Sequence, residues 1–315
     1  MILSKLLRRP VQIIAGAATA NIQTTNLLLG KLLSNQVRAL GPRRDLRDAE
    51  FRVFSQWGDD GIIQYLIHNV PIENDAFIEF GVEDYTESNT RFLLFNDNWR
   101  GLIMDASAEN MACVQRDDLY WRHDLTSICE FISRENINQL ISGAGFNGPI
   151  GLLSIDIDGN DYWIWEAIDV VDAAIVVVEY NSVFGPSRAL SVPYDPAFRR
   201  TNAHWSNLYW GCSLRALCQL ADKKGYAFVG SNANGNNAYF VKRELADGVL
   251  VKTPEDGYVT SRFRESRDPA GQLTYVGGAK RRSLISDMMV MDVEHNVLVR
   301  LGDVPYQERP AKCRQ

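Results

Sequence analysis

Two apolar runs that each end abruptly in acidic side chains place the strongest constraint on the fold of this chain. Residues 152–155 (Leu-Leu-Ser-Ile) lead into Asp156, and residues 176–178 (Val-Val-Val) lead into Glu179. Runs of this kind indicate strands that are buried on both faces of a parallel sheet. Because ligands of open α/β sheets bind outside the carboxyl ends of the strands, these acids predict a site at that edge.

The side chains beyond the two runs carry the oxygen atoms that a hard divalent cation prefers as ligands. They are Asp156, Asp158, Asp161, Glu179 and Asn181. For any single member, a helix N-cap or a polar loop group is an equally good interpretation. The whole set, placed at two strand ends, favours a functional site.

From residue 51 onward, strand and helix patterns alternate, which predicts a doubly wound α/β sheet. Strands are predicted over 76–81, 101–105, 120–124, 151–157 and 174–180, and helices over 61–67, 90–95, 128–132, 163–168 and 214–221. Residues 226–230 and 237–241 flank a turn-rich stretch, so a hairpin with a reversed last strand is expected. This predicts a Rossmann-like sheet of seven mostly parallel strands with the last strand antiparallel, as in class I methyltransferases.

Three parts are predicted along the chain: a helical extension and linker (1–50), the Rossmann-like domain (51–245) and a C-terminal cap that binds substrate (246–315). Leucines recur at helical spacing over 27–37, and residues 1–50 carry eight Lys or Arg against three acids. Core packing or self-association of this helix is one interpretation, and peripheral membrane contact is the other. The basic, apolar start at 1–9 is followed by Pro10 and polar residues, which do not suit a membrane span.

Charge and cysteine content narrow the class of protein further. The formal net charge of -6 gives no general attraction for nucleic acid, and the five cysteines form no CxxC pair. An odd number of cysteines fits free thiols in a reducing compartment better than a disulfide framework. A cytoplasmic protein that does not bind nucleic acid is therefore expected.

Four segments resemble the FkbM-like family of S-adenosylmethionine-dependent methyltransferases, and within it a bacterial subgroup associated with surface glycan biosynthesis. The segments are 54–61, 77–90, 154–167 and 211–240. Residues 155–161 look like the acidic strand-end motif of the family, and 234–240 look like its closing hairpin. The resemblance covers residues 50–245 and implies an O-methyltransferase that acts on a sugar hydroxyl of a polysaccharide or of its precursor.

The chain departs from the wider methyltransferase pattern in the turn after the first strand. Such enzymes usually carry a glycine-rich turn there, whereas Gly81 is followed by Glu83, Asp84 and Tyr85 and no second glycine up to residue 90. A dinucleotide is disfavoured, because its pyrophosphate needs close backbone approach and would be repelled by the acids. The methyl donor carries positive charge and tolerates carboxylates better.

The resemblance implies that Glu79 and Gly81 lie against the methionine part of the cofactor. Asp105, at the end of the second strand, is expected to accept hydrogen bonds from both ribose hydroxyls. An N-cap or a solvated loop is the alternative for several further candidates. Asn89 would join Glu79 and Gly81 at the methionine part, Asp124 would face the adenine, and the residues before the first strand would cover the cofactor. These further candidates are Asn89, Asp124, Ser55, Gln56 and Asp59.

Methyl transfer to a hydroxyl requires that the acceptor oxygen be held in line and that its proton leave. Asp156, Asp158 and His204 are the candidates for this work, and His204 has a suitable ordinary pKa. A structural histidine packed on Trp205 or Tyr209 is the alternative.

By analogy with metal-dependent sugar O-methyltransferases, Mg²⁺ would be held by Asp158 (or Asp156), Glu179 and Asn181. FkbM-like proteins are not uniformly metal-dependent, so a metal-free site is the alternative.

A basic stretch near the C-terminus suggests how an acceptor could be held. Arg262, Arg264 and Arg267 are candidates to bind a phosphate, a carboxylate or an acidic sugar, although a solvated charged face is the more common interpretation. Two other functions stay open beside sugar O-methylation. They are methylation of a small secondary metabolite and a cofactor-free scaffold in glycan assembly.

Overall fold

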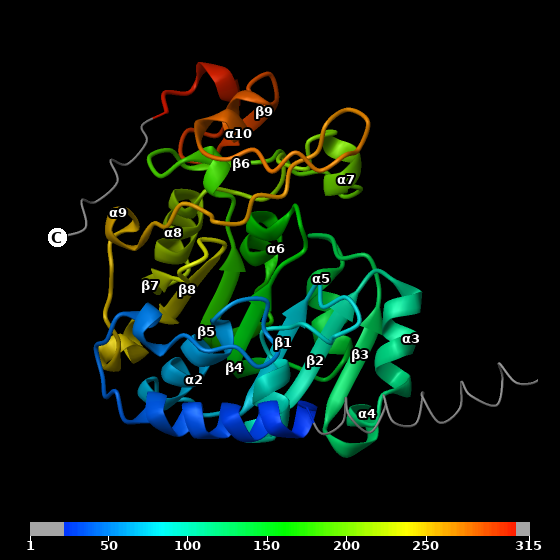
Figure 1. The fold of residues 1–315 in the computed structure, drawn as a ribbon, viewed down its shortest axis with the longest axis vertical. Coiled ribbons are helices and arrows are strands. Elements are labelled where there is room, and N and C mark those ends of the chain that lie inside the picture. Colours follow the sequence, from blue (N-terminus) through cyan, green and yellow to red (C-terminus); the bar gives the residue numbers. More distant parts are fainter. Residues whose placement is uncertain (1–21, 307–315) are drawn as a thin grey trace, which may run out of the picture.

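A computed structural model describes residues 22–306, and its centre is a seven-stranded sheet (Figure 1). The strand order is β3-β2-β1-β4-β5-β8-β7. The strands are β1 Ala76–Phe80, β2 Arg100–Asp105, β3 Leu125–Cys129, β4 Gly148–Ile155, β5 Val171–Glu179, β7 Tyr226–Ser231 and β8 Asn237–Lys242. Strands β1 to β5 pair in parallel, and β8 lies antiparallel between β5 and β7. The predicted fold, with a reversed last strand, is confirmed.

Helices cover both faces of the sheet and form a three-layer arrangement. One face is covered by α2 (Asp59–Asn69), α3 (Ala108–Arg116), α4 (Leu119–Arg122) and a helix over residues 22–38, and the other by α5 (Ile137–Gly143), α6 (Asp161–Ala167) and α8 (Leu214–Lys223). Successive strand residues serve opposite faces: Phe77 packs in the α2 layer, whereas Ile78 packs in the α6 layer. This alternation explains why the strands are apolar throughout.

The helix over 22–38 packs against the α2 layer, along the end of the sheet that lies lowest in Figure 1. Leu27, Leu33 and Val37 contact this layer, and Ser34 Oγ donates to Gln64 Oε1 at 2.5 Å. The opposite side of the helix exposes four apolar residues: Ile22, Leu28, Leu29 and Leu32. Core packing by one side of the helix is thus observed, and membrane contact stays a prediction. The basic residues 1–9 lie outside the described part of the chain.

The third strand lies later than the sequence pattern predicts. Residues 119–122 form α4, and the strand is Leu125–Cys129, so the predictions of a strand over 120–124 and a helix over 128–132 are wrong. The aromatic pair at 120–121 has strand propensity, but the Asp117 carboxylate accepts from the Leu119 N–H at 2.9 Å and starts a helical turn. The half-exposed edge strand β3 contains Thr126 and Ser127 and therefore lacks an apolar run.

A cap lies over the end of the sheet at which the parallel strands finish (Figure 1). Its small sheet joins β6 (Leu190–Ser191) to β9 (Met289–Asp292) and β10 (Val297–Arg300), so a segment of the central part contributes to it. The cap has an apolar cluster of its own around Leu190, Ile285 and Leu301. The remaining short helices are α7 Arg200–Ala203, α9 Pro254–Gly257, α10 Ala279–Ser283, η1 Leu46–Ala49, η2 Leu93–Asp97, η3 Ser182–Phe184, η4 Arg243–Gly248 and η5 Leu301–Asp303.

Two further sequence-based expectations concern membrane spans and thiols. Within residues 22–306, no helix has both the length and the apolar character that crossing a membrane requires. The four described cysteines, Cys113, Cys129, Cys212 and Cys218, are free thiols, and Cys313 lies outside the described residues.

Candidate active site

A cavity of about 670 Å³ opens between the carboxyl ends of the strands and the cap. This size lies within the range typical of small-molecule sites. Its described lining contains nine carboxylates and two arginines, Arg199 and Arg200. The carboxylates belong to Glu79, Glu83, Glu87, Asp105, Glu130, Asp156, Asp158, Glu179 and Glu265. The cavity is therefore strongly electronegative, and it suits a ligand that carries positive charge.

The turn after β1 lies in this cavity and adopts left-handed backbone at every second residue. The φ angles are +72° at Gly81, +49° at Glu83 and +62° at Tyr85. A Cβ on Gly81 would lie 1.6 Å from the carbonyl oxygen of Asp156, so only glycine fits at the contact between the β1 and β4 ends. Glycines would adopt this left-handed conformation freely, whereas Glu83 and Tyr85 adopt it at a cost in backbone strain.

Glu79 organises this turn from inside. It is buried and accepts hydrogen bonds from Ser88 Oγ (2.8 Å), the N–H groups of Asn89 (2.9 Å) and Thr90 (3.1 Å), and Thr90 Oγ1 (2.5 Å). Burial raises the pKa of Glu79, and these four donors oppose the shift. Both carboxylate oxygens have partners, so Glu79 holds the turn in shape. Asn89 also lines the cavity, and its side-chain amide donates to Ser154 Oγ at 3.1 Å.

Asp105 ends β2 and faces the same cavity. Its Oδ2 accepts from the Glu83 N–H at 3.0 Å, and its Oδ1 accepts from the Ser107 N–H at 2.7 Å. Each oxygen retains a further lone pair for a ligand donor. Two fixed oxygens at a strand end can accept from two adjacent hydroxyl groups, which is the geometry that a ribose requires.

Three carboxylates gather where β4 and β5 end. Oxygen atoms of Asp156, Asp158 and Glu179 lie within 4.8 Å of one another. Burial, followed by the charges of neighbouring acids, raises the pKa of Asp156 and of Glu179 well above their ordinary values. Oε2 of Glu179 is enclosed and has no hydrogen-bond partner among the described residues. Asp158 instead pairs with Arg200, whose Nη1 lies 2.5 Å from Oδ1.

Asp161 does not join this cluster, because its carboxylate braces the loop that carries it. It accepts from the N–H groups of Ile157 (2.8 Å) and Gly159 (3.0 Å) at the start of α6. Burial raises its pKa to about 6. The interpretation as a polar loop group therefore describes Asp161, while Asp156, Asp158 and Glu179 face the cavity.

Of the three candidates that precede β1, only Gln56 lines the cavity. The Ser55 side chain donates to Asp60 Oδ2 at 2.9 Å and accepts from the Asp60 N–H at 3.0 Å. Asp59 is buried, and its Oδ1 accepts from Asn232 Nδ2 (2.9 Å) and Asn237 Nδ2 (3.0 Å). The structure thus uses Ser55 and Asp59 to hold the segment against the β7–β8 hairpin and the start of α2.

Asp124 lies at the wrong edge of the sheet for its predicted role. It directly precedes β3, so it occupies the amino end of that strand, where it is 73% exposed and lies 3.7 Å from Arg100. The expectation that it faces an adenine is corrected, because the strand begins at Leu125. Glu130, which follows β3, lines the cavity instead, and the misplaced strand concealed it in the sequence.

His204 and Asn181 do not line the cavity. Nδ1 of His204 accepts from the Ser206 N–H at 3.2 Å, its ring packs on Trp205, and burial lowers its pKa. Asn181 caps η3: its Oδ1 accepts from the Val183 N–H, and its Nδ2 donates to the carbonyls of Leu208 and Trp210. The packed histidine and the helix cap, which were the alternatives, describe both residues.

The three C-terminal arginines are placed differently from one another. Arg267 pairs with Glu265 at 3.2 Å, whereas Arg262 and Arg264 line a second, smaller cavity on the cap side. Arg200, which pairs with both Asp158 and Glu265, is a charged group at the main cavity that the sequence pattern did not indicate. No acidic or glycine motif surrounds it that could have marked it.

The sheet order and strand directions define the fold of class I methyltransferases. No protein-family model matches the chain, and no curated protein matches it. Among solved structures, a S-adenosylmethionine-dependent methyltransferase from Clostridium acetobutylicum ATCC 824 is 9% identical, covering 58% of this chain and 89% of its own, with a TM-score of 0.38. The N-terminal domain of EvdMO1 with SAH bound is 9% identical (66% and 93%; TM-score 0.39). The O-methyltransferase from Bacillus cereus in complex with SAH is 13% identical (68% and 81%; TM-score 0.33).

Proposed function

We propose that this protein is a S-adenosylmethionine-dependent methyltransferase that methylates a hydroxyl group, with a sugar of a surface polysaccharide or of its precursor as the acceptor. The electronegative cavity at the carboxyl edge of a methyltransferase-type sheet carries this proposal. A sulfonium and an ammonium group suit such a cavity, whereas a dinucleotide does not. The sugar acceptor rests on the resemblance to FkbM-like enzymes.

The residues of the β1 and β2 ends would hold the methyl donor. Asp105 would present two oxygens to the ribose hydroxyls, and Gly81, which lines the same cavity, would lie against the methionine part. Glu79 keeps this turn in shape through its four hydrogen bonds. When bound, S-adenosylmethionine supplies a methyl group on a positively charged sulfur.

The Asp156–Glu179 pair would remove the acceptor proton. Two buried carboxyl groups so close together cannot both ionise readily, so a state in which they share one proton is favoured and one carboxylate remains as a base. That carboxylate would accept the proton of the acceptor hydroxyl, and S-adenosylmethionine held at the β1 and β2 ends would supply the methyl group to the acceptor oxygen. General base catalysis of this kind contributes about 10²–10⁴-fold in rate. Arg200 fixes Asp158 beside the pair.

The same three carboxylates fit a divalent cation. The enclosed, unpaired Oε2 of Glu179 and the raised pKa values are features that a bound cation would relieve. Asp156, Asp158 and Glu179 would then hold Mg²⁺, which lowers the pKa of an acceptor hydroxyl. Asn181 is not needed for this set, because its amide is already hydrogen-bonded.

Calorimetric titration with S-adenosylhomocysteine tests the proposal, with and without Mg²⁺. Saturable binding is expected for the unmodified chain, and Asp105→Ala should weaken it by about tenfold or more because two hydrogen bonds to a charged acceptor are lost. Asp124→Ala is the matched control, since it removes an acid from the opposite edge and should leave affinity unchanged. Absence of binding would favour the cofactor-free scaffold. In an assay of methyl incorporation, transfer only to a small metabolite would show that the acceptor is not a sugar.

A further inference from the structure

A second cavity, of about 160 Å³, lies in the cap beside the main one. Its described lining contains four arginines, Arg262, Arg264, Arg281 and Arg282, and no acid. The hydroxyl-bearing residues Ser182, Tyr258, Thr260, Ser261 and Tyr306 complete the polar part of the lining. A water molecule occupies about 30 Å³, so a phosphate or diphosphate group fits in this space.

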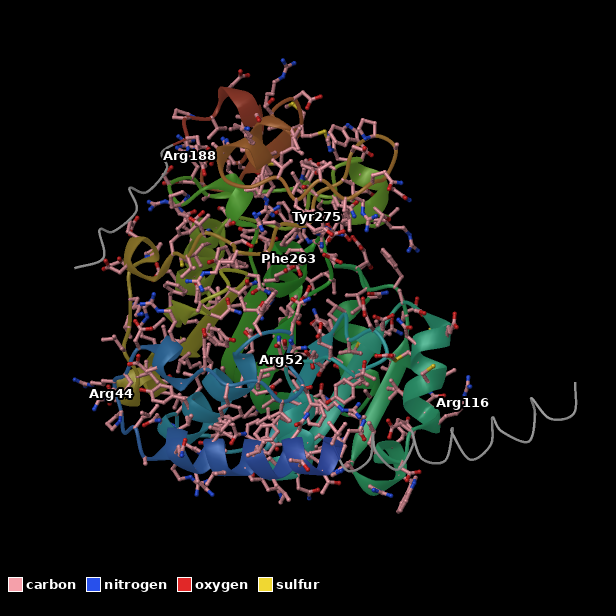
Figure 2. All side chains as sticks on the ribbon, in the orientation of Figure 1. Arg44, Arg52, Arg116, Arg188, Phe263 and Tyr275 are labelled. Carbon is pink, nitrogen blue, oxygen red and sulfur yellow. The ribbon has the colours of Figure 1, made fainter. Side chains whose placement is uncertain are left out.

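One short segment separates the two cavities. In residues 261–265, which we term the strap, Phe263 and Glu265 line the main cavity while Arg262 and Arg264 line the second one. The strap is fixed on both sides, because the Ser261 N–H donates to Ser182 Oγ at 3.0 Å and the Arg262 N–H donates to the Asn234 carbonyl at 2.8 Å. Figure 2 shows Phe263 between the cap and the sheet. Alternate residues of the strap thus line different cavities, with the acid Glu265 at the main cavity and the two arginines at the second one.

Arg281 is a buried arginine of the second cavity that has no acidic partner among the described residues. Its side chain is only 5% exposed, and its Nε is buried without a hydrogen-bond partner among the described residues. Arg262, Arg264 and Arg281 take part in none of the ion pairs between described residues. A buried guanidinium without an anion is costly, and burial together with the nearby charge of Arg200 lowers its pKa. A bound anion would relieve this cost.

Arg282 has a different role in the same cavity. Its guanidinium donates to the carbonyls of Phe184, Leu301 and Val304 at 2.9 to 3.0 Å and stacks on Tyr306. These bonds fix it in place but leave its charge uncompensated. The cavity therefore combines one anchored guanidinium, one buried and unpaired guanidinium, and two exposed ones on the strap.

We infer that this arginine cavity binds a phosphate or diphosphate group of the acceptor. Planar guanidinium forks match phosphate oxygens in both geometry and charge. The main cavity suits this group poorly, because its described lining holds nine carboxylates against two arginines. The inference rests on the proposed function only in naming the acceptor as the carrier of the phosphate, which makes the acceptor a phosphorylated glycan or a nucleotide-linked sugar.

Titration with pyrophosphate in the presence of EDTA tests the arginine cavity. The unmodified protein should bind pyrophosphate saturably, and the double variant Arg262→Gln/Arg264→Gln should bind about tenfold or more weakly. Both replaced side chains are exposed, so the variant should fold. Arg300→Gln removes an exposed arginine of the cap outside the cavity and should leave binding unchanged. Tighter binding of uridine diphosphate than of pyrophosphate would identify a nucleotide-linked acceptor, and equal binding a phosphorylated glycan.

Failure of the inference is distinguishable from failure of the proposed function. Unchanged pyrophosphate affinity in the double variant, or absence of saturable binding to the unmodified protein, would overturn the arginine cavity as a phosphate site. S-adenosylhomocysteine affinity, measured on the same samples, should be equal in the double variant and the unmodified chain. Absence of S-adenosylhomocysteine binding to the unmodified protein, with pyrophosphate binding that is saturable and weakened in the double variant, would contradict the methyl-donor assignment and leave the phosphate site standing.

Discussion

Two glutamates at the carboxyl edge of the sheet differ in how their charges are satisfied. Glu79, near the end of β1, accepts four hydrogen bonds from the turn that follows it. Glu179, at the end of β5, has an enclosed oxygen that lacks a hydrogen-bond partner among residues 22–306, and it lies against Asp156. Burial raises the pKa of both. The difference indicates that the β1 end is a scaffold that shapes the site, whereas the β4–β5 end is held in a costly state that chemistry can use.

The largest expected effect lies where these two regions touch. Gly81→Ala would place a Cβ 1.6 Å from the Asp156 carbonyl oxygen, at a residue with φ of +72°. The chain must shift there, so we expect a loss of more than about 3 kcal/mol in the free energy of unfolding, together with loss of S-adenosylhomocysteine binding. Urea unfolding and calorimetry measure the two effects. Unchanged stability would show that the β1 and β4 ends are not rigidly joined.

Replacement of the satisfied glutamate should be the next largest effect. Both carboxylate oxygens of Glu79 accept hydrogen bonds. In Glu79→Gln, an amide NH₂ replaces one of these oxygens and cannot accept, and the negative charge that strengthens the remaining bonds is lost. We expect a loss of about 2–3 kcal/mol in unfolding free energy, measured in urea at pH 7. A stability equal to that of the unmodified chain would contradict the scaffold role.

The matched change at the other end should act in the opposite direction. The pKa of Glu179 is higher in the folded protein than in the unfolded chain. The folded protein therefore loses stability as the pH rises above the unfolded pKa of this group. Glu179→Gln should therefore match the unmodified chain near pH 4 and exceed it by about 1 kcal/mol near pH 8, in EDTA. Urea unfolding across this pH range provides the measurement. A loss of stability at pH 8 would show that Glu179 is a structural group after all.

The smallest expected effect concerns the strained turn. Glu83 has φ of +49°, a conformation that costs a non-glycine residue about 1 kcal/mol. Glu83→Gly removes this strain but loosens the unfolded chain, so the unfolding free energy should change by less than about 1 kcal/mol. Its N–H can still donate to Asp105, so affinity for S-adenosylhomocysteine should persist. Loss of binding would mean that the Glu83 side chain itself contacts the ligand.

The sequence pattern predicted the sheet well because its buried strands are long apolar runs. The four central predictions at β1, β2, β4 and β5 are confirmed, as is the reversed hairpin of β7 and β8. It failed at β3, since an edge strand with Thr126 and Ser127 lacks such a run and a local aspartate bond starts a helix before it. Because the strand was predicted five residues too early, Asp124 was assigned to the carboxyl edge of the sheet, and Glu130, which follows β3, was not predicted as a site residue.

The site was predictable where it follows directly from a strand end. Glu79, Gly81, Asp105, Asp156, Asp158 and Glu179 all line the main cavity. Arg200 and Arg281 were not predictable as site residues, because their positions depend on how the cap folds back over the sheet. Equally, no periodic apolar pattern in the strap indicates that Arg262 and Arg264 point away from the main cavity.

A crystal structure of the protein with S-adenosylhomocysteine would show whether the electronegative cavity holds the methyl donor. We expect the ligand to occupy this cavity, with its ribose hydroxyls on Asp105 and its sulfur on the side of the Asp156–Glu179 pair. Density for the ligand elsewhere, or an empty cavity at saturating concentration, would contradict the assignment of this cavity to a methyl donor.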